Sequence, residues 1–198
     1  MTTNKLFSKP VCMSILICGF IYGLILPFCW GNNPLSETGT LSLLCEDRQF
    51  FFWIWGILSA GGLVFNTQYL YNKFGCKNKF LNALCILALL SMVGVAVTLG
   101  HDITTWNPKR IIHWVTTGTF VAFVIAAIAL FFLINIKKFK NFGILAACSL
   151  SVLGVFLFMF LVIGKSGLME IVPLALLEIF MFIVNFTPIV KVKPKTNT

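Results

Sequence analysis

The side chains in this sequence that could do chemistry are two histidines, His101 and His113, and a small set of acids. The acids that accompany them are Glu37, Glu46, Asp47, Asp102 and Glu170. Histidine and carboxylate ligands can hold a zinc ion, which lowers the pKa of a bound water and makes it a nucleophile for hydrolysis. No His-x-x-x-His or His-Glu-x-x-His spacing occurs, and Pro108 lies between the two histidines. The pattern therefore favours an interfacial His113 and solvated acids over a metal or hydrolytic site.

Glu178 differs from the other acids because it lies within a long apolar segment. It is about ten residues from the start of that segment, or roughly 15 Å along a helix. An ionised side chain near the centre of a bilayer costs a few kcal/mol or more. The residues expected at the same depth with hydroxyl donors are Tyr22, Ser59 and Thr119. We expect Glu178 to form a hydrogen-bonded clasp between helices, with proton or ligand coupling as the alternative.

The elements that must position these residues are long apolar helices. Runs of about 20 residues or more can cross a hydrocarbon core of roughly 30 Å as helices. Such runs cover, approximately, residues 10–30, 50–70, 80–100, 111–136, 142–164 and 168–190. The sequence therefore predicts an all-α, polytopic membrane protein with six transmembrane helices.

The charges of the connecting segments predict the orientation. Of the fifteen Lys and Arg residues, eleven fall in segments that share one side: Lys5, Lys9, Lys73, Lys77, Lys79, Lys137, Lys138, Lys140, Lys191, Lys193 and Lys195. The other three loops contain Arg48, Lys109, Arg110 and Lys165 together with most of the acids. Because Lys and Arg are retained on the cytoplasmic side, both termini are expected to be cytoplasmic. The five tryptophans are expected near the outer boundary.

The composition indicates one domain over residues 1–198 and excludes several functional classes. Hydrophobic residues make up 59% of the chain, which leaves no room for a soluble catalytic domain. The net charge of +9 is spread over short segments without a basic helix, so it fits contact with anionic lipid headgroups rather than nucleic acid. No Cys-x-x-Cys motif, cofactor motif or metal motif is present. Whether Cys29 and Cys45 form a disulfide is left open by the sequence.

Small residues suggest where helices approach closely. Gly19 and Gly23 form a Gly-x-x-x-Gly pair in the first span, and Ser59, Ala60, Gly61 and Gly62 form a small patch in the second. Such residues let the backbones of membrane helices pack together. Asn66, Gln68, Asn82 and Asn185 form a polar level near the other membrane boundary, where we expect interhelical hydrogen bonds.

The loop after the first span resembles an element of a known family. Its Ser36-Glu37-Thr38-Gly39-Thr40 stretch is similar to the Ile-Ser-Asp-Thr-Gly-Thr element of the Frag/DRAM/Sfk membrane proteins, with Glu37 at the acidic position. Ser91 to Gly94 in the third span and Ile112-His113-Trp114 in the fourth agree with it. A bacterial six-span family of unknown function shares much of this outline. The resemblance implies a six-span layout and an ordered outer cap, in which Gly39 is expected to have a positive φ.

These features favour a non-enzymatic protein of the Frag/DRAM/Sfk type that acts in membrane organisation, lipid handling or signalling. The candidate binding residues are Glu37, His101, Asp102, His113 and Glu178. The expected partners are membrane lipids, with a membrane-protein partner or a second copy of the chain as further candidates. The alternatives are a small transporter or channel subunit that uses Glu178 and a lipid hydrolase that uses the outer histidines and carboxylates. The sequence does not distinguish a plasma or inner membrane from an endomembrane.

Overall fold

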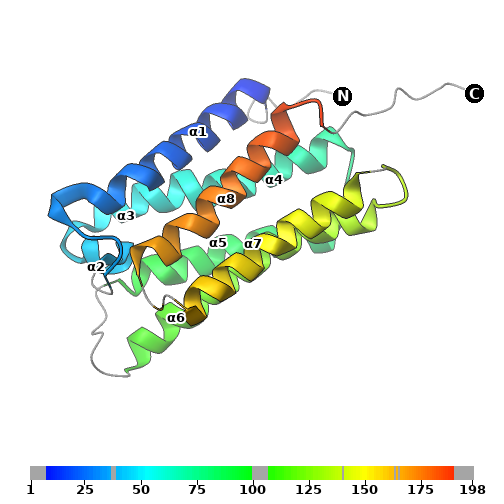
Figure 1. Cartoon of the computed structure of the whole chain (residues 1–198). Helices are drawn as coiled ribbons and strands as arrows, with labels where there is room; N and C mark the ends of the chain where they lie inside the picture. The colour runs from blue at the N-terminus through cyan, green and yellow to red at the C-terminus, as the bar shows by residue number, and fades with distance from the viewer. Residues whose placement is uncertain are drawn as a thin grey trace, which may run out of the picture.

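Six helices long and apolar enough to cross a membrane make up the fold (Figure 1). The computed structural model describes residues 8–36, 39–99, 107–139, 141–162, 164 and 166–189. The spans within these residues cover Lys9–Gly31, Glu46–Lys73, Lys79–Val97, Pro108–Ile134, Phe142–Val162 and Gly167–Phe186. All six predicted spans are therefore confirmed, and the chain is an all-α, multi-pass membrane protein.

The helices within the spans differ in regularity. The first span contains α1 (Lys9–Ile25) and a 3₁₀ turn over Leu26–Gly31. The second contains α3 (Gln49–Trp55), a π-helical segment η5 (Gly56–Gly61) and α4 (Gly62–Lys73), which follow one another directly. The remaining spans are α5 (Lys79–Val97), α6 (Pro108–Ile134), α7 (Phe142–Val162) and α8 (Gly167–Phe186). A short helix, α2 (Leu41–Leu44), and a 3₁₀ turn (η4, Glu46–Arg48) precede the second span.

Three of these spans begin with an N-cap residue whose side chain accepts hydrogen bonds from the first turn of the helix. Asn78 accepts hydrogen bonds from the backbone of Phe80 and Leu81, Asn107 from Arg110, and Ser166 from Met169. Asn107 is followed by Pro108, whose fixed φ suits a first helical turn and whose missing N–H would have had no helical partner there. The polar residues at these junctions therefore specify where the helices start.

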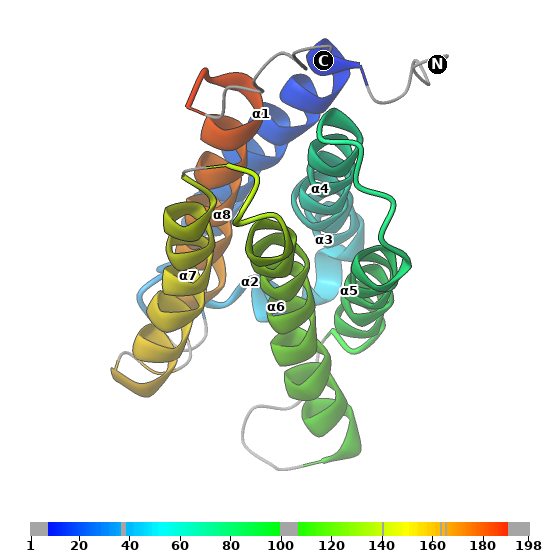
Figure 2. The same cartoon turned by 90° about the vertical axis from the view of Figure 1, so that its right-hand side faces the viewer.

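The six spans form a ring whose neighbours contact one another in the order α1, α8, α7, α6, α5 and α4 (Figures 1 and 2). The first and last spans are thus side by side. α4 also contacts α6 and α8 across the ring. α1 begins and α8 ends at the same end of the bundle (Figure 1). The opposite end carries residues 32–36 and 39–48, which we call the cap, and is termed the cap end.

α1 packs closely on the second span through glycine. A methyl group added to Gly19 would lie 2.7 Å from the carbonyl oxygen of Leu58, and one added to Gly62 would lie 3.1 Å from Ile15. The Ser59 hydroxyl donates to the carbonyl of Gly19 at 3.3 Å. The predicted close contact of small residues in the first two spans is confirmed.

Amide side chains join the helices at the end opposite the cap. Asn66 donates to the carbonyl of Cys12 at 3.0 Å, and Asn185 donates to the carbonyl of Asn66 at 3.0 Å. Gln68 donates to Asn82 at 3.1 Å. These bonds connect α1, α4, α5 and α8, which confirms the predicted interhelical role of the four amides.

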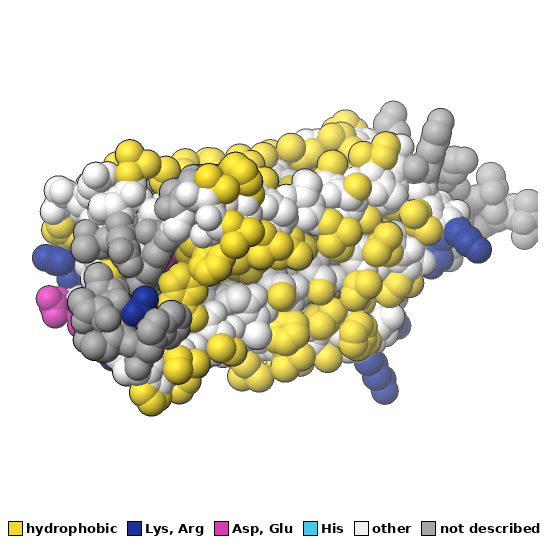
Figure 3. Space-filling model, turned by 60° about the horizontal axis from the view of Figure 1, so that its bottom comes forward, with side chains coloured by type: hydrophobic (Ala, Val, Ile, Leu, Met, Phe, Trp, Pro, Cys, Tyr) yellow, Lys and Arg dark blue, Asp and Glu magenta, His cyan; other side chains and the backbone are white. Residues whose placement is uncertain are grey.

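The sides of the bundle are apolar, and its two ends carry the charges. Leu161 is 79% exposed, and Ile57 and Ile144 are each 66% exposed, as expected of residues that face lipid. Figure 3 shows one such face, where hydrophobic side chains cover the length of the bundle, acidic ones gather at one end, and Lys or Arg are present at both ends. This pattern supports a membrane-spanning bundle, while its cytoplasmic or outer orientation stays a prediction from the charges.

Candidate functional site

The cap folds onto the end of the bundle as a packed structure. Asn32 donates from its side chain to the carbonyls of Pro27 and Gly39, at 2.8 and 3.2 Å. Leu41 and Cys45 are fully buried. The backbone N–H of Leu168, at the start of α8, donates to the carbonyl of Pro34 at 3.1 Å. The first loop and the last span are therefore joined directly, as an ordered cap requires.

Glycine is needed in the cap for space and not for backbone conformation. The positive φ predicted for Gly39 is wrong, because the glycines with positive φ are Gly31, Gly75 and Gly164. A methyl group on Gly39 would instead meet the carbonyl of Asn33, and one on Gly167 would meet the carbonyl of Gly39. The close approach of three backbone segments excludes a side chain at position 39.

Glu170 connects the cap to the bundle. It lies in the first turn of α8, where the partial positive charge of a helix N-terminus favours a carboxylate. Its Oε2 accepts a hydrogen bond from the backbone N–H of Leu41 at 2.6 Å, and its Oε1 accepts one from the Ser42 hydroxyl at 3.4 Å. The Glu170 carboxylate thus binds the first residues of α2. The sequence predicted solvated acids, and Glu170 departs from that prediction because it is half-buried and bonded to the cap.

The Cys45 thiol lies close enough to Glu170 to be affected by its charge. Burial, and secondarily the Glu170 carboxylate, raise the pKa of Cys45 to about 11. Cys29 and Cys45 are both free thiols. The disulfide that the sequence left open is absent from this pair.

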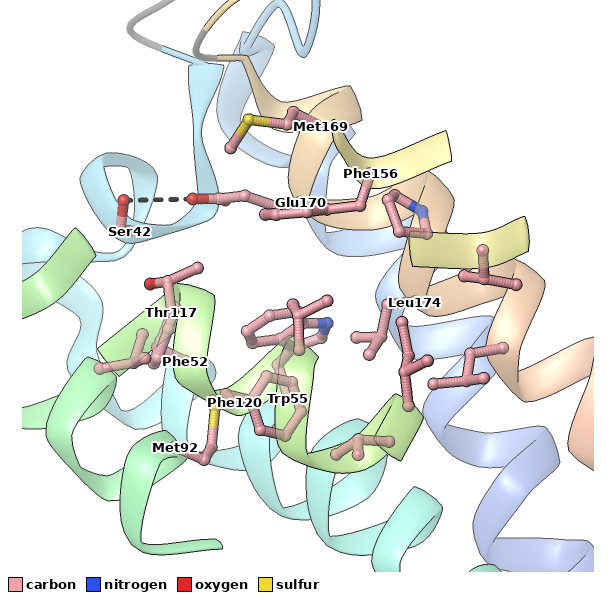
Figure 4. A pocket seen from close by; sticks show the side chains of 17 residues that line it. Ser42, Phe52, Trp55, Met92, Thr117, Phe120, Phe156, Met169, Glu170 and Leu174 are labelled. Atoms are coloured by element: carbon pink, nitrogen blue, oxygen red, sulfur yellow. Dashed lines mark hydrogen bonds between the residues drawn. The ribbon is translucent and has the colours of Figure 1, made fainter. Parts of the chain in front are cut away.

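Below Glu170, a crevice extends into the bundle between α6, α7 and α8 (Figure 4). Its volume is about 60 Å³, which is room for a few water molecules or for a short stretch of an apolar chain. Phe52, Trp55, Met92 and Phe120 are among the residues that line it. Figure 4 shows Glu170 reaching across one end of the crevice to Ser42, with the aromatic rings deeper inside.

The crevice has one polar end and apolar walls. Ser42, Thr117 and Glu170 are the only lining residues with hydroxyl or carboxyl groups. Val121 of α6, Phe156 of α7 and Leu174 of α8 line it and are each half-buried, so the crevice communicates with the surface of the bundle. Trp55 is only 7% exposed and lines the crevice. Trp55 therefore faces the crevice and not the lipid, whereas Trp30 and Trp53 are exposed.

A second cavity lies between α1 and α8 and contains the Glu178 side chain. Glu178 is 3% exposed, and its Oε1 accepts no hydrogen bond from any described residue. Two of the expected clasp partners bind elsewhere: Tyr22 donates to the carbonyl of Phe51 at 3.2 Å, and Thr119 donates to Ser91 at 3.1 Å. The predicted clasp with these two hydroxyls is wrong, whereas the third expected partner, Ser59, does interact with the Glu178 carboxyl group.

Only part of the outer histidine and carboxylate set lies within the described residues. Glu37, His101 and Asp102 lie outside the described residues. His113 is 4% exposed, and its Nδ1 lies 3.1 Å from the hydroxyl oxygen of Thr98. The Thr98 hydroxyl also lies 2.7 Å from the carbonyl of Gly94 and 3.1 Å from that of Val95, and the direction of its bond with His113 depends on the histidine tautomer. His113 thus bonds to the residue that ends α5, in line with the expected interfacial role.

Sequence reasoning found Glu178 and missed the crevice. Glu170 was visible only as an acid near a span boundary, and Ser42 as an ordinary loop residue. The one available signal was that Glu170 falls in the first turn of a span, where a carboxylate can bond to neighbouring backbone. Comparison of the chain with protein-family models, with curated proteins and with solved structures finds no match.

Proposed function

We propose that this chain is a non-enzymatic membrane protein that acts in lipid handling, by holding part of a lipid in the crevice between α6, α7 and α8. The observation that carries the proposal is the combination of apolar walls with a single polar end at Ser42, Thr117 and Glu170. A lipid has the same division into an apolar chain and a polar group. The polar end lies beside the cap, near the level expected for headgroups.

The size of the crevice decides how a lipid would bind. About 60 Å³ is far below the roughly 300–1,000 Å³ of sites that enclose a whole small molecule. A lipid therefore places a short segment of one chain in the crevice and keeps the rest along the open side, in the bilayer. Such partial burial suits a protein that orients or passes on a lipid.

The chemistry of the crevice supports a role without catalysis. Glu170 is the only titratable residue that lines it, and both of its carboxylate oxygens already accept hydrogen bonds from the cap. The lining residues include no histidine, cysteine or lysine. A covalent mechanism needs a nucleophile beside a base that can take its proton, and this set does not supply that pair. The resemblance of the Ser36 to Thr40 stretch to the Frag/DRAM/Sfk proteins agrees with the proposed class.

Quenching of Trp55 fluorescence by lipids with brominated chains tests the proposal. Trp55 is kept as the only tryptophan, with the other four replaced by phenylalanine, and the folded protein is placed in bilayers of brominated phospholipid. We expect strong quenching, because a bromine-bearing chain in the crevice would touch the buried indole. Val152→Phe should fill the crevice and restore the emission, whereas Val162→Phe, at a position that is 65% exposed, should not.

The outcomes separate a bound chain from the surrounding bilayer. A variant that keeps only the exposed Trp53 measures quenching by bulk lipid, and Val152→Phe should leave it unchanged. An unquenched Trp55, or quenching that Val152→Phe does not reduce, would show that no lipid chain enters the crevice.

A further inference from the structure

Glu178 is a buried acid that the protein leaves partly unbonded. It lies near the middle of α8, about 11 residues and roughly 16 Å from the start of that helix. Its Oε1 lies above Gly19 of α1, where an added methyl group would be 3.1 Å away. This oxygen is buried and accepts no hydrogen bond from the described residues. Because a buried acceptor without a partner lowers the stability of the fold, its presence suggests that this oxygen binds a ligand.

Ser59 interacts with the Glu178 carboxyl group but leaves its Oε1 without a hydrogen bond. The Ser59 hydroxyl donates to the carbonyl of Gly19 at 3.3 Å. Lys73 approaches α8 closely, but it does so at the far end of that helix, where it donates to the carbonyls of Val184 and Asn185 at 3.3 and 3.0 Å. No described lysine, arginine or histidine lines the cavity that holds Glu178. The protein thus provides an acidic group without providing its cation.

The cavity beside Glu178 is large enough for a small organic molecule. Its volume is about 190 Å³, and an apolar protein cavity of about 150 Å³ is known to bind benzene. The other residues that line it are Leu16, Ile17 and Phe20 of α1 and Ile179 and Phe182 of α8. Ile17 and Ile179 are 39% and 44% exposed, so the cavity opens toward the lipid-facing side of the bundle.

The composition of this site specifies the chemistry of its ligand. A carboxylate near the bilayer centre requires a proton or a cation beside it. The rings of Phe20 and Phe182 can attract a cation through their faces, and the aliphatic side chains accept an apolar group. A metal ion would need several oxygen ligands, and the lining offers only one carboxyl group. An ammonium group attached to a small apolar body meets all of these conditions.

We propose that the α1/α8 cavity is a binding site for a small apolar amine, whose ammonium group donates to the Glu178 carboxylate. The amine enters from the bilayer between Ile17 and Ile179 and carries one aromatic or alkyl group of about the size of a substituted benzene. This site is separate from the crevice between α6, α7 and α8, and its occupancy does not depend on the lipid role proposed there.

Calorimetric titration of the purified protein in detergent tests the site with three probes of similar size. Benzylamine carries the ammonium group, benzyl alcohol carries a neutral donor, and toluene carries neither. Heats from protein-free micelles are subtracted, since all three probes partition into detergent. We expect benzylamine to bind at least tenfold more tightly than benzyl alcohol, and toluene to bind most weakly.

Two substitutions show whether the carboxylate is responsible. Glu178→Gln keeps the size of the side chain and removes the charge, so it should weaken benzylamine binding at least tenfold and leave toluene binding unchanged. Glu178→Leu should also lose the amine, because it has no carboxylate. Equal binding of the three probes, unchanged amine binding in Glu178→Gln, or no amine binding by the parent would overturn the proposal.

Discussion

Replacement of Gly19 by alanine tests the closest helix crossing in the bundle. The added methyl group would lie 2.7 Å from the Leu58 carbonyl oxygen and 3.1 Å from Oε1 of Glu178. The Leu58 oxygen belongs to the backbone of η5 and cannot rotate away, so α1 must move outward. We therefore expect Gly19→Ala to lower the free energy of unfolding.

The size of the effect follows from three contributions. Overpacking of a well-packed contact costs about 1–3 kcal/mol. Outward movement of α1 also lengthens the bond from Ser59 to the Gly19 carbonyl, and such bonds in membranes are worth about 0.6 kcal/mol on average. Alanine offsets these costs by up to about 1 kcal/mol through its higher helix propensity. The expected net loss is about 1–2 kcal/mol, given these ranges.

The assay is reversible unfolding in mixed micelles of increasing dodecyl sulfate content, followed by helical circular dichroism. Gly154→Ala in α7 is the matched control, because an added methyl group there would meet nothing within 4 Å. That control should be neutral or slightly stabilising. If Gly19→Ala unfolds at the same detergent composition as Gly154→Ala, then α1 and η5 are not in the close contact described above.

Four further outcomes are expected. Because burial and the nearby carboxylate raise the pKa of Cys45 to about 11, above the ordinary value of 9.0, Cys45 should react with iodoacetamide far more slowly than Cys29 at pH 8; equal rates by mass spectrometry would contradict this. The Cys45 thiol ionises at a lower pH in the unfolded chain than in the folded protein, so the free energy of unfolding should fall as the pH rises from about 9 to 11. The melting temperature should fall over the same pH range. Asn66→Ala and Asn185→Ala should each destabilise the protein. Their coupling in a double-mutant cycle should stay below about 0.6 kcal/mol, because Asn185 bonds mainly to the backbone of Asn66. A coupling above about 1.7 kcal/mol would refute that geometry. For topology, in a variant whose native cysteines are replaced by serine, an impermeant maleimide should label Leu35→Cys on intact cells and Lys77→Cys only after permeabilisation. The reverse pattern would invert the predicted orientation.

Hydropathy predicted the spans because a segment that crosses a membrane is recognisable from its own run of apolar residues. The spacing of Gly19 and Gly23 correctly predicted that Gly19 lies at a close helix contact, since a pair of small residues within an apolar helix usually serves close packing. The four amides near the end opposite the cap could be assigned to interhelical bonds for a similar reason. Each of these inferences needs only the distance of a residue along its own helix.

The sequence did not show how each helix is rotated about its own axis, which decides the side chains that face one another. Tyr22, Ser59 and Thr119 were placed at the depth of Glu178, but equal depth does not say which way a side chain points. In the structure, Tyr22 bonds to Phe51 and Thr119 bonds to Ser91, so neither reaches the carboxyl group. The same lack concealed that Trp55 faces inward.

The cap shows a second limit of sequence reasoning. Glu170 and Leu41 are 129 residues apart along the chain, and no local pattern predicts that one bonds to the other. Gly39 was singled out for a conformation that it does not adopt, and the close approach of its carbonyl to Gly167, 128 residues away, could not be seen in the loop sequence. Contacts of this kind become visible only when the ring of helices is assembled.

The bonds from α8 to the cap also impose an order on biosynthesis. The first loop is synthesised early. The partners of its Leu41 N–H and its Pro34 carbonyl, which are Glu170 and the N–H of Leu168, are synthesised about 130 residues later. Until the sixth span enters the membrane, the loop lacks the groups that fix it, and α1 lacks a neighbour on one side. A nascent chain halted before residue 167 would therefore have an open ring and an incompletely bonded cap. Completion of the last helix is the step that turns five inserted spans into a folded protein.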